Sequence, residues 1–376
     1  MTQPGVSRID PSPSDVIDSL MRADGRRDLA PLRDGRPEAT THTQGSYQAL
    51  FTEPSATAVT RAERLATALR VAALHAESAL IDHYAAQLLA TGPDSARLVS
   101  DTLSGPGAPG LPTRLRAMLV HADLLVIRPG AATPSDLAAL QAVGLSAPEI
   151  VTVSQVIAFT SFQVRVLIGL TLLRGDERAL PTVQIGPRDA PNEGFTLDEL
   201  GWSPWIVPFE AADATDEQRA VLPGRRLESP YFRLLALDPA VLGERTATDM
   251  GIFYTHGGLP RAERELSATV TSRVNGCVYC ASVHSRQAAQ ISKRTDDVQR
   301  VLDVGIGAEL DDRWRGIVDF AAALTVTPPD ATQSHMARLR ELGLDDLQIL
   351  DIAQAAAFFS WANRLMLTLG EPRRPT

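Results

Sequence analysis

Two cysteines and one histidine at helical spacing are the residues of this chain best suited to chemistry. They lie in the segment NGCVYCASVH, residues 275–284, where Cys280 follows Cys277 by three positions and His284 comes four positions later. Residues three or four apart share one face of a helix, so we expect the three side chains to lie together. A thiol with an imidazole one turn away is the arrangement of an activated nucleophile.

The expected start of this helix favours a thiolate. Gly276 would weaken a helix interior, so we predict that the helix begins here, with Asn275 as its N-cap and both thiols in its first turns. There the helix dipole and free N–H groups lower a thiol pKa from its ordinary value of roughly 8.5. Because His284 is one turn from Cys280, we predict that Cys280 attacks and Cys277 resolves its sulfenic acid into a disulfide.

Less reactive interpretations of these residues stay open. The cysteines can be two small buried hydrophobic residues, and His284 can be an ordinary core histidine. A zinc site would use Cys277, Cys280 and His284, but structural zinc takes four ligands and the chain has no second Cys-x-x-Cys. Glu265 can be a solvated helix carboxylate. We predict a reactive dithiol and no metal.

Glu265 extends the pattern upstream. It stands twelve positions before Cys277 and directly follows the sequence RAER of residues 261–264. Together with Cys-x-x-Cys and the histidine four residues later, it resembles the alkylhydroperoxidase (AhpD) signature of the carboxymuconolactone decarboxylase-like superfamily. The resemblance is strong over about residues 240–370 and weaker over 55–170. Tyr279 departs from the pattern, since the best-known members carry a histidine there; we keep Tyr279 as an accessory candidate.

The resemblance implies a fold and an activity. It implies an all-helical, trimeric or hexameric protein that reduces organic hydroperoxides with the Cys277/Cys280 dithiol, while Glu265 and His284 relay protons for Cys280. It also implies an external dithiol reductant of the lipoyl or thioredoxin type and no bound cofactor. Two alternatives remain: a dithiol–disulfide oxidoreductase or decarboxylase-like relative that does not use peroxide, and a non-enzymatic redox-sensing or assembly module.

An internal repeat predicts the elements that must position these residues. The sequence RAER occurs at residues 61–64 and 261–264, and VGL at 143–145 is answered by LGL at 342–344, in the same order and at offsets of 200 and 199. A conserved order of matches is the signature of a tandem duplication. The chain therefore looks like two copies of one domain.

The first copy lacks the thiols. Aligned with a one-residue gap, it has Ala76 and Ala79 opposite the two cysteines and keeps only His83 opposite His284. Without a nucleophile it cannot carry out thiol chemistry. We expect it to be a structural half, with His83 as a structural residue.

Apolar residues recur at helical spacing in both copies, whereas alternating strand patterns are scarce. The predicted fold class is all-α: two tandem AhpD-like helical bundle domains joined by a Pro- and Trp-containing connector. The expected boundaries are an N-terminal extension at 1–45, the degenerate domain at 46–173, the connector at 174–250 and the catalytic domain at 251–376. Within the connector, 231–235 should form a short helix, and Ser334 or Asp345 should cap a later one.

Composition limits where the protein can be located and which classes of partner it can bind. A net charge of −9 argues against nucleic acid, and two cysteines cannot build a disulfide framework. The first residues lack a secretory signal, and the most apolar stretch, 156–173, is interrupted by Gln163 and Arg165, so neither export nor membrane insertion is expected. We predict a cytoplasmic homo-oligomer, a trimer of pseudo-dimers, with the helices ending near Arg165 and Arg364 as contact surfaces.

Overall fold

Helices make up nearly all of the regular structure. The computed structural model describes residues 15–22, 26–52, 57–180, 182–190 and 194–374, so the expectation about the first residues lies outside the described part. The helices of the first half are α1 (Val16–Met21), α2 (Ala30–Arg33), α3 (Pro37–Phe51), α4 (Arg61–Leu74), α5 (Ser78–Leu89), α6 (Ser95–Ser104), α7 (Thr113–Ile127), η1 (Pro129–Ala131), α8 (Pro134–Ala142) and α9 (Ala147–Arg174).

The second half continues in the same way. Its elements are β1 (Gly201–Pro204), η2 (Ala211–Asp213), α10 (Asp216–Val221), η3 (Gly224–Glu228), α11 (Pro230–Leu235), α12 (Pro239–Phe253), α13 (Arg261–Val274), α14 (Val278–Ser292), α15 (Thr295–Val304), η4 (Gly305–Gly307), α16 (Asp312–Thr325), α17 (Gln333–Glu341), α18 (Asp346–Leu369) and β2 (Gly370–Arg373). The all-α prediction is confirmed. The short helix expected at 231–235 is α11, and Asp345 caps α18, whereas α17 is capped by Thr332 instead of Ser334.

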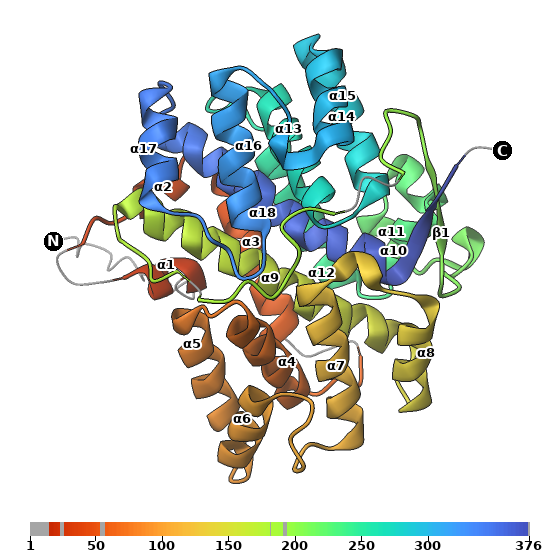
Figure 1. Cartoon of the computed structure of the whole chain (residues 1–376). Coiled ribbons are helices and arrows are strands. Elements are labelled where there is room, and N and C mark those ends of the chain that lie inside the picture. Colours follow the sequence, from red (N-terminus) through yellow and green to blue (C-terminus); the bar gives the residue numbers. More distant parts are fainter. Residues whose placement is uncertain (1–14, 23–25, 53–56, 181, 191–193, 375–376) are drawn as a thin grey trace, which may run out of the picture.

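The order of helices repeats along the chain. Helices α3 to α9 and helices α12 to α18 follow one another with closely similar lengths and loops. Figure 1 shows most of the first set in the lower part of the molecule and most of the second in the upper part, with α9 and α18 crossing between them. Helix α12 packs on α3 and α18 packs on α9, so the two sets share one hydrophobic core. Helix α12 starts at residue 239, within the segment expected to be connector.

Two buried arginines join the sets. Arg165 on α9 donates from Nη2 to the carbonyl of Thr325 at the end of α16 (2.6 Å), and Arg364 on α18 donates to the carbonyl of Val126 near the end of α7 (3.3 Å). Both arginines are 0% exposed. A cation is favourable at the carbonyl end of a helix, which explains why these charges are retained in the core. The expectation that these helices form subunit contacts is therefore wrong, because their arginines are enclosed within one chain.

Helix α9 is the most apolar helix. It is long and apolar enough to cross a membrane by length and composition alone, yet 94% of its most apolar 18-residue window is buried inside the fold. Capping by Ser146 and Glu149 starts it, and Gly175 with a left-handed backbone ends it. It is a core helix around which both sets pack.

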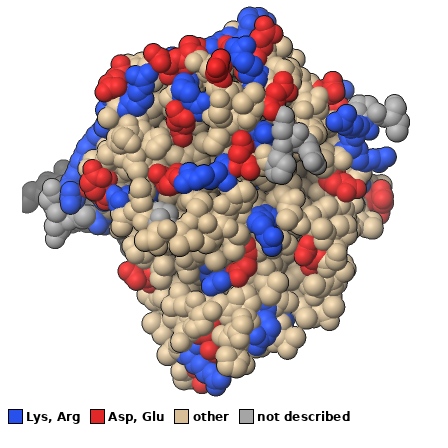
Figure 2. Space-filling model, viewed as in Figure 1, with Lys and Arg blue, Asp and Glu red and all other residues tan. Residues whose placement is uncertain are grey.

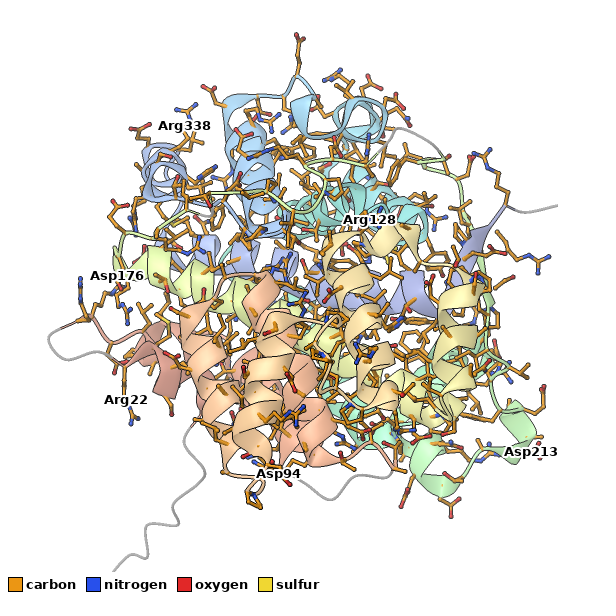
Figure 3. The ribbon with its side chains drawn as sticks, turned by 60° about the horizontal axis from the view of Figure 1, so that its bottom comes forward. Arg22, Asp94, Arg128, Asp176, Asp213 and Arg338 are labelled. Carbon is orange, nitrogen blue, oxygen red and sulfur yellow. The ribbon has the colours of Figure 1, made fainter. Side chains whose placement is uncertain are left out.

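The remaining elements close the molecule. Strand β1 pairs antiparallel with β2, so the connector is fastened to the end of α18. Acidic and basic side chains are interspersed on the face seen in Figure 2, without a large patch of one sign. In the turned view of Figure 3, Asp94 before α6 and Arg338 on α17 lie toward opposite sides, with the packed helices between them.

Candidate active site

The dithiol lies at a sharp junction between two helices. Helix α13 ends with Asn275 as its C-cap, Gly276 adopts a positive φ of 77°, and Cys277 is the N-cap of α14. The predicted helix start at Asn275 was therefore wrong by two residues. Gly276 reverses the chain in a left-handed conformation that glycine adopts at little cost, and this places Cys280 in the first turn of α14.

The two thiols form an asymmetric pair. Both cysteines are free and buried, and each acts on the pKa of the other. The hydrogen bond from Cys277, together with the positive charge of His284, lowers the pKa of Cys280 against the effect of burial. Burial and the neighbouring sulfur raise the pKa of Cys277 well above its ordinary value. Cys280 is thus the thiol that ionises more readily, and Cys277 the one that stays protonated and donates to it.

Glu265 and His284 meet next to this pair. The Nδ1 atom of His284 lies 2.5 Å from Oε2 of Glu265, and Arg261 donates from Nε to Oε1 of the same carboxylate at 2.6 Å. Glu265 is 0% exposed, so it is not a solvated surface carboxylate. The structure therefore brings all four predicted residues, Cys277, Cys280, His284 and Glu265, into one cluster.

Asn363 on α18 completes the dithiol environment, and the sequence analysis did not identify it. Its side chain is fully buried and favours the ionised form of both thiols, since its polar group acts to lower the pKa of each. Its amide oxygen accepts from Asn275 Nδ2, and its Nδ2 donates to Ser272 Oγ, both at 3.0 Å. An amide held from both sides in this way keeps a fixed orientation beside the thiols. The sequence carried no local signal for it, because Asn363 is separated from Asn275 by 88 positions.

Cys280 opens onto a pocket of about 290 Å³. His284 and Tyr279 line it from α14, and α11, α12, α18 and strand β1 contribute most of the rest of the wall. Most of the wall is apolar or aromatic, formed by Trp202, Pro230, Tyr231, Phe232, Val283, Phe358, Phe359, Ala362 and Met366. Arg245 and Asp249 on α12 are its other charged residues. The half-buried Tyr279 is thus at the site, as an accessory residue would be.

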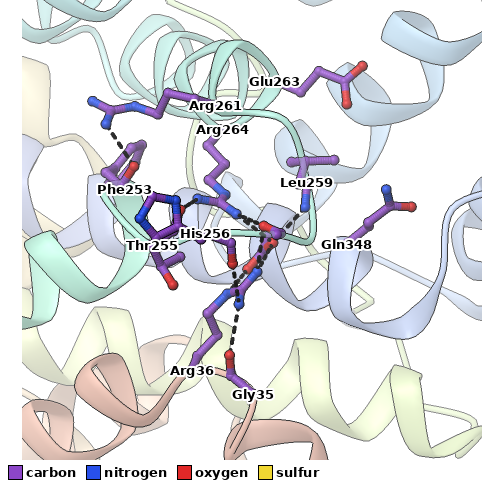
Figure 4. Close-up of polar contacts among 12 residues, drawn as sticks. Gly35, Arg36, Phe253, Thr255, His256, Leu259, Arg261, Glu263, Arg264 and Gln348 are labelled. Atoms are coloured by element: carbon purple, nitrogen blue, oxygen red, sulfur yellow. Dashed lines mark hydrogen bonds and ion pairs between the residues drawn. The ribbon is translucent and has the colours of Figure 1, made fainter.

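A buried ion network holds the start of α13. The carboxylate of Asp351 on α18 accepts from Arg36 Nε (2.6 Å), from Arg264 Nη2 (3.2 Å) and from the backbone N–H of Leu259 (2.8 Å). Figure 4 shows Arg36, Arg264 and Leu259 converging from separate elements. Because Arg264 directly precedes Glu265, this network fixes the turn of α13 that carries the Glu265 carboxylate.

The first half differs from the expected alignment. Ala76 has a positive φ of 53°, like Gly276, and Glu77 is the N-cap of α5, as Cys277 is of α14. The two halves thus align here without a gap, and Glu77 and Leu80, not Ala76 and Ala79, stand opposite the cysteines. The counterpart of His284 is Tyr84, while His83 contacts Tyr47 at 2.9 Å. The conclusion that this half lacks a dithiol is unaffected.

The described residues were compared with the side-chain groupings that hold metal ions. Within the described part of the chain, no three His, Cys, Asp or Glu side chains are grouped so as to hold a metal ion. The carboxylate of Glu265 is instead engaged by His284 and Arg261. The cluster thus combines two thiols with an imidazole–carboxylate pair.

Comparison with known proteins finds a family match and a structural similarity, each over part of the chain. A crystal structure described as an alkylhydroperoxidase AhpD core, an uncharacterized peroxidase-related protein from Ralstonia eutropha JMP134, is 28% identical, with 46% of this chain and 90% of that chain covered and a TM-score of 0.39. No curated protein matches the chain. Residues 239–323 match the model of the carboxymuconolactone decarboxylase family, and all four predicted site residues fall within them. The matched segment carries the dithiol, and its family is the group that the sequence resembles.

Proposed function

We propose that this protein is a thiol-dependent peroxidase that reduces organic hydroperoxides. The observation that carries the proposal is the position of Cys280, whose pKa is lowered by the Cys277 hydrogen bond, on the wall of a mainly apolar pocket beside the His284–Glu265 pair. The thiolate supplies a nucleophile, and the apolar wall suits the organic part of a hydroperoxide.

In the first step the Cys280 thiolate attacks the terminal oxygen of the hydroperoxide. The new S–O bond forms as the O–O bond breaks, and the electron pair leaves on the organic oxygen. The His284 imidazolium supplies the proton that turns this alkoxide into an alcohol, and Glu265, 2.5 Å away, stabilises the charged imidazole beforehand. Cys280 is left as a sulfenic acid.

In the second step Cys277 attacks the Cys280 sulfur. The S–O bond breaks, the hydroxide takes up the proton from the Cys277 thiol by way of His284, and water leaves as the disulfide forms. The resting hydrogen bond between the two thiols supports this step, because little movement is needed. An external dithiol of the lipoyl or thioredoxin type then reduces the disulfide by exchange. This cycle needs no bound cofactor, and it suits the reducing cytoplasm, our proposed location.

The test combines peroxide consumption with thiol counting. With cumene hydroperoxide and a dihydrolipoyl or thioredoxin donor, we expect catalytic consumption, and without a donor we expect one equivalent of peroxide to remove both thiols. Thiol loss driven by a disulfide but not by peroxide would favour the oxidoreductase alternative. Retention of both thiols with every oxidant would contradict the proposal.

A further inference from the structure

One charge in the pocket lacks a partner. The Arg245 side chain is 4% exposed and lines the pocket, and its Nε atom has no hydrogen-bond partner. Among the described residues, none forms a hydrogen bond or ion pair with this guanidinium. Its contacts are with aromatic rings, 5.0 Å from the ring centre of Phe358 and 5.8 Å from that of Trp361. A buried charge is costly unless it is paired, so this guanidinium is suited to an anion that enters the pocket.

A second polar group in the same wall is also unsatisfied. The hydroxyl of Tyr231 on α11 is buried without a hydrogen-bond partner, in a side chain that is 6% exposed. Its ring packs edge-on against Trp202 at 5.4 Å, which holds the orientation of the hydroxyl. Buried polar groups are rarely left without partners unless a ligand or water supplies one. Two donors from different helices thus face one small cavity.

The charges around the cavity favour a permanently anionic ligand. Glu265 is paired with Arg261 and His284, and the negative charge of Cys280 faces the positive charge of His284. Arg245 also helps to lower the pKa of Cys280 and has Asp249 one turn further along α12, but it forms an ion pair with neither. Burial raises the pKa of Asp249, although Arg245 and His284 oppose this, so the carboxyl compensates Arg245 only weakly. A neutral hydroperoxide would leave the Arg245 guanidinium without a directly paired anion.

We propose that this pocket holds the carboxylate of its substrate between the Arg245 guanidinium and the Tyr231 hydroxyl. Resting on the proposed peroxidase function, this assigns the substrate class: small organic hydroperoxides that also carry a carboxylate. Arginine suits this role because its planar fork matches the two carboxylate oxygens. The aromatic wall then covers the carbon chain, and the hydroperoxide group reaches Cys280. The pocket volume of about 290 Å³ limits the carbon chain to a short one.

Binding can be tested apart from turnover. Hexanoate has the carboxylate and a short chain, and hexanamide is its neutral match, so each is used to protect Cys280 of the full-length protein from alkylation by iodoacetamide. We expect hexanoate to protect at a concentration about tenfold or more below that of hexanamide. Arg245→Met and Tyr231→Phe should each weaken protection by hexanoate, whereas Arg225→Met, at an exposed arginine of η3, should not. Equal protection by acid and amide would overturn the proposal.

Turnover gives the second measurement. The ratio of kcat/KM for 5-hydroperoxyhexanoic acid to that for its methyl ester should be about ten or more in the wild type and fall toward one in Arg245→Met. If Arg245→Met slows both substrates equally and raises the pKa of Cys280, the arginine acts on the thiolate and the proposal fails. If Arg245→Met does not fold, Tyr231→Phe, which removes only the hydroxyl, must still lower the ratio. Protection by hexanoate without any peroxide turnover would retain the carboxylate site and reject the peroxidase.

Discussion

The Nδ1 atom of His284 lies 2.5 Å from Oε2 of Glu265, deep in the protein. Burial opposes the imidazolium, but the Glu265 charge outweighs burial and raises the pKa of His284 above 6.5. Burial also opposes the carboxylate, but His284 and Arg261 hold the pKa of Glu265 below 4.5. The contribution of this ion pair to the free energy of unfolding is therefore fully present between pH 4.5 and pH 6.5. It is lost as the pH rises through the raised pKa of His284, or falls through the lowered pKa of Glu265.

The two cysteines should behave differently when each is replaced. Cys280→Ser should abolish peroxide turnover, because the serine hydroxyl is not ionised near neutral pH. Cys277→Ser should leave one oxidisable thiol that stops as a sulfenic acid, since nothing resolves it. Mass spectrometry after one equivalent of peroxide distinguishes the two, and a sulfenic acid formed on Cys277 in Cys280→Ser would reverse the assignment.

Removal of the relay should raise the pKa of Cys280. Glu265→Gln lowers the pKa of His284, so less positive charge faces the thiolate, and His284→Ala removes that charge altogether. We expect the midpoint of the pH profile of Cys280 alkylation to rise by about one pH unit, on the order of 1.4 kcal/mol. Glu263→Gln is the matched control, because Glu263 is on the same helix but pairs with Arg313. An equal shift in the control would rule out a specific relay.

Replacement of the two core arginines should reveal their capping role. Arg165→Met leaves the Thr325 carbonyl without its 2.6 Å donor, whereas the Val126 carbonyl freed by Arg364→Met still accepts from Thr327 Oγ1 at 3.2 Å. Both substitutions remove one desolvated charge. The difference between their changes in unfolding free energy therefore measures the cost of leaving the Thr325 carbonyl without a donor. The free energy of unfolding should fall by about 1–3 kcal/mol in Arg165→Met and by less in Arg364→Met. Urea denaturation measures both, and the reverse order would contradict the capping interpretation.

Asp351 should be far more important for stability than its neighbour Asp346. Asp351→Asn leaves Arg36 and Arg264 buried without their carboxylate, which should lower the free energy of unfolding by about 3–5 kcal/mol. Asp346→Asn on the same helix breaks only solvent-accessible pairs with Arg27 and Arg340 and should cost about 1 kcal/mol or less. Thermal or urea unfolding measures the free energy of unfolding of both variants. A loss in Asp351→Asn as small as that in Asp346→Asn would show that the buried network does not stabilise the fold.

The assembly should contain one dithiol per chain. The repeated helix order lets one chain supply a pseudo-dimer, so three chains provide six helical units and three sites. Light scattering should therefore report a trimer of about three times 40.4 kDa, and thiol titration two thiols per chain. A monomer equivalent to one pseudo-dimer is the next expected state, and a stable pentamer would contradict the repeat argument.

The sequence predicted the parts of the site that depend on local geometry. The spacing of Cys277, Cys280 and His284 places them together on α14, and the twelve-residue step back to Glu265 reaches the preceding helix of the same hairpin. The helical pattern likewise indicated the fold class. The exact helix start was missed, because Gly276 can end one helix or begin another, and only the packing of α13 on α14 decides which.

Other features were decided by the tertiary structure alone. Asn363, Arg245 and Tyr231 come from three helices whose place around the dithiol is set by packing across the core, and the repeat gave no hint that Arg165 and Arg364 are buried within one chain. Helical periodicity relates residues three or four positions apart, so it determines which side chains share a face. Helical periodicity says nothing about residues separated by tens of positions. Such residues meet only because the helices pack through their apolar faces, which brings the polar groups on them together.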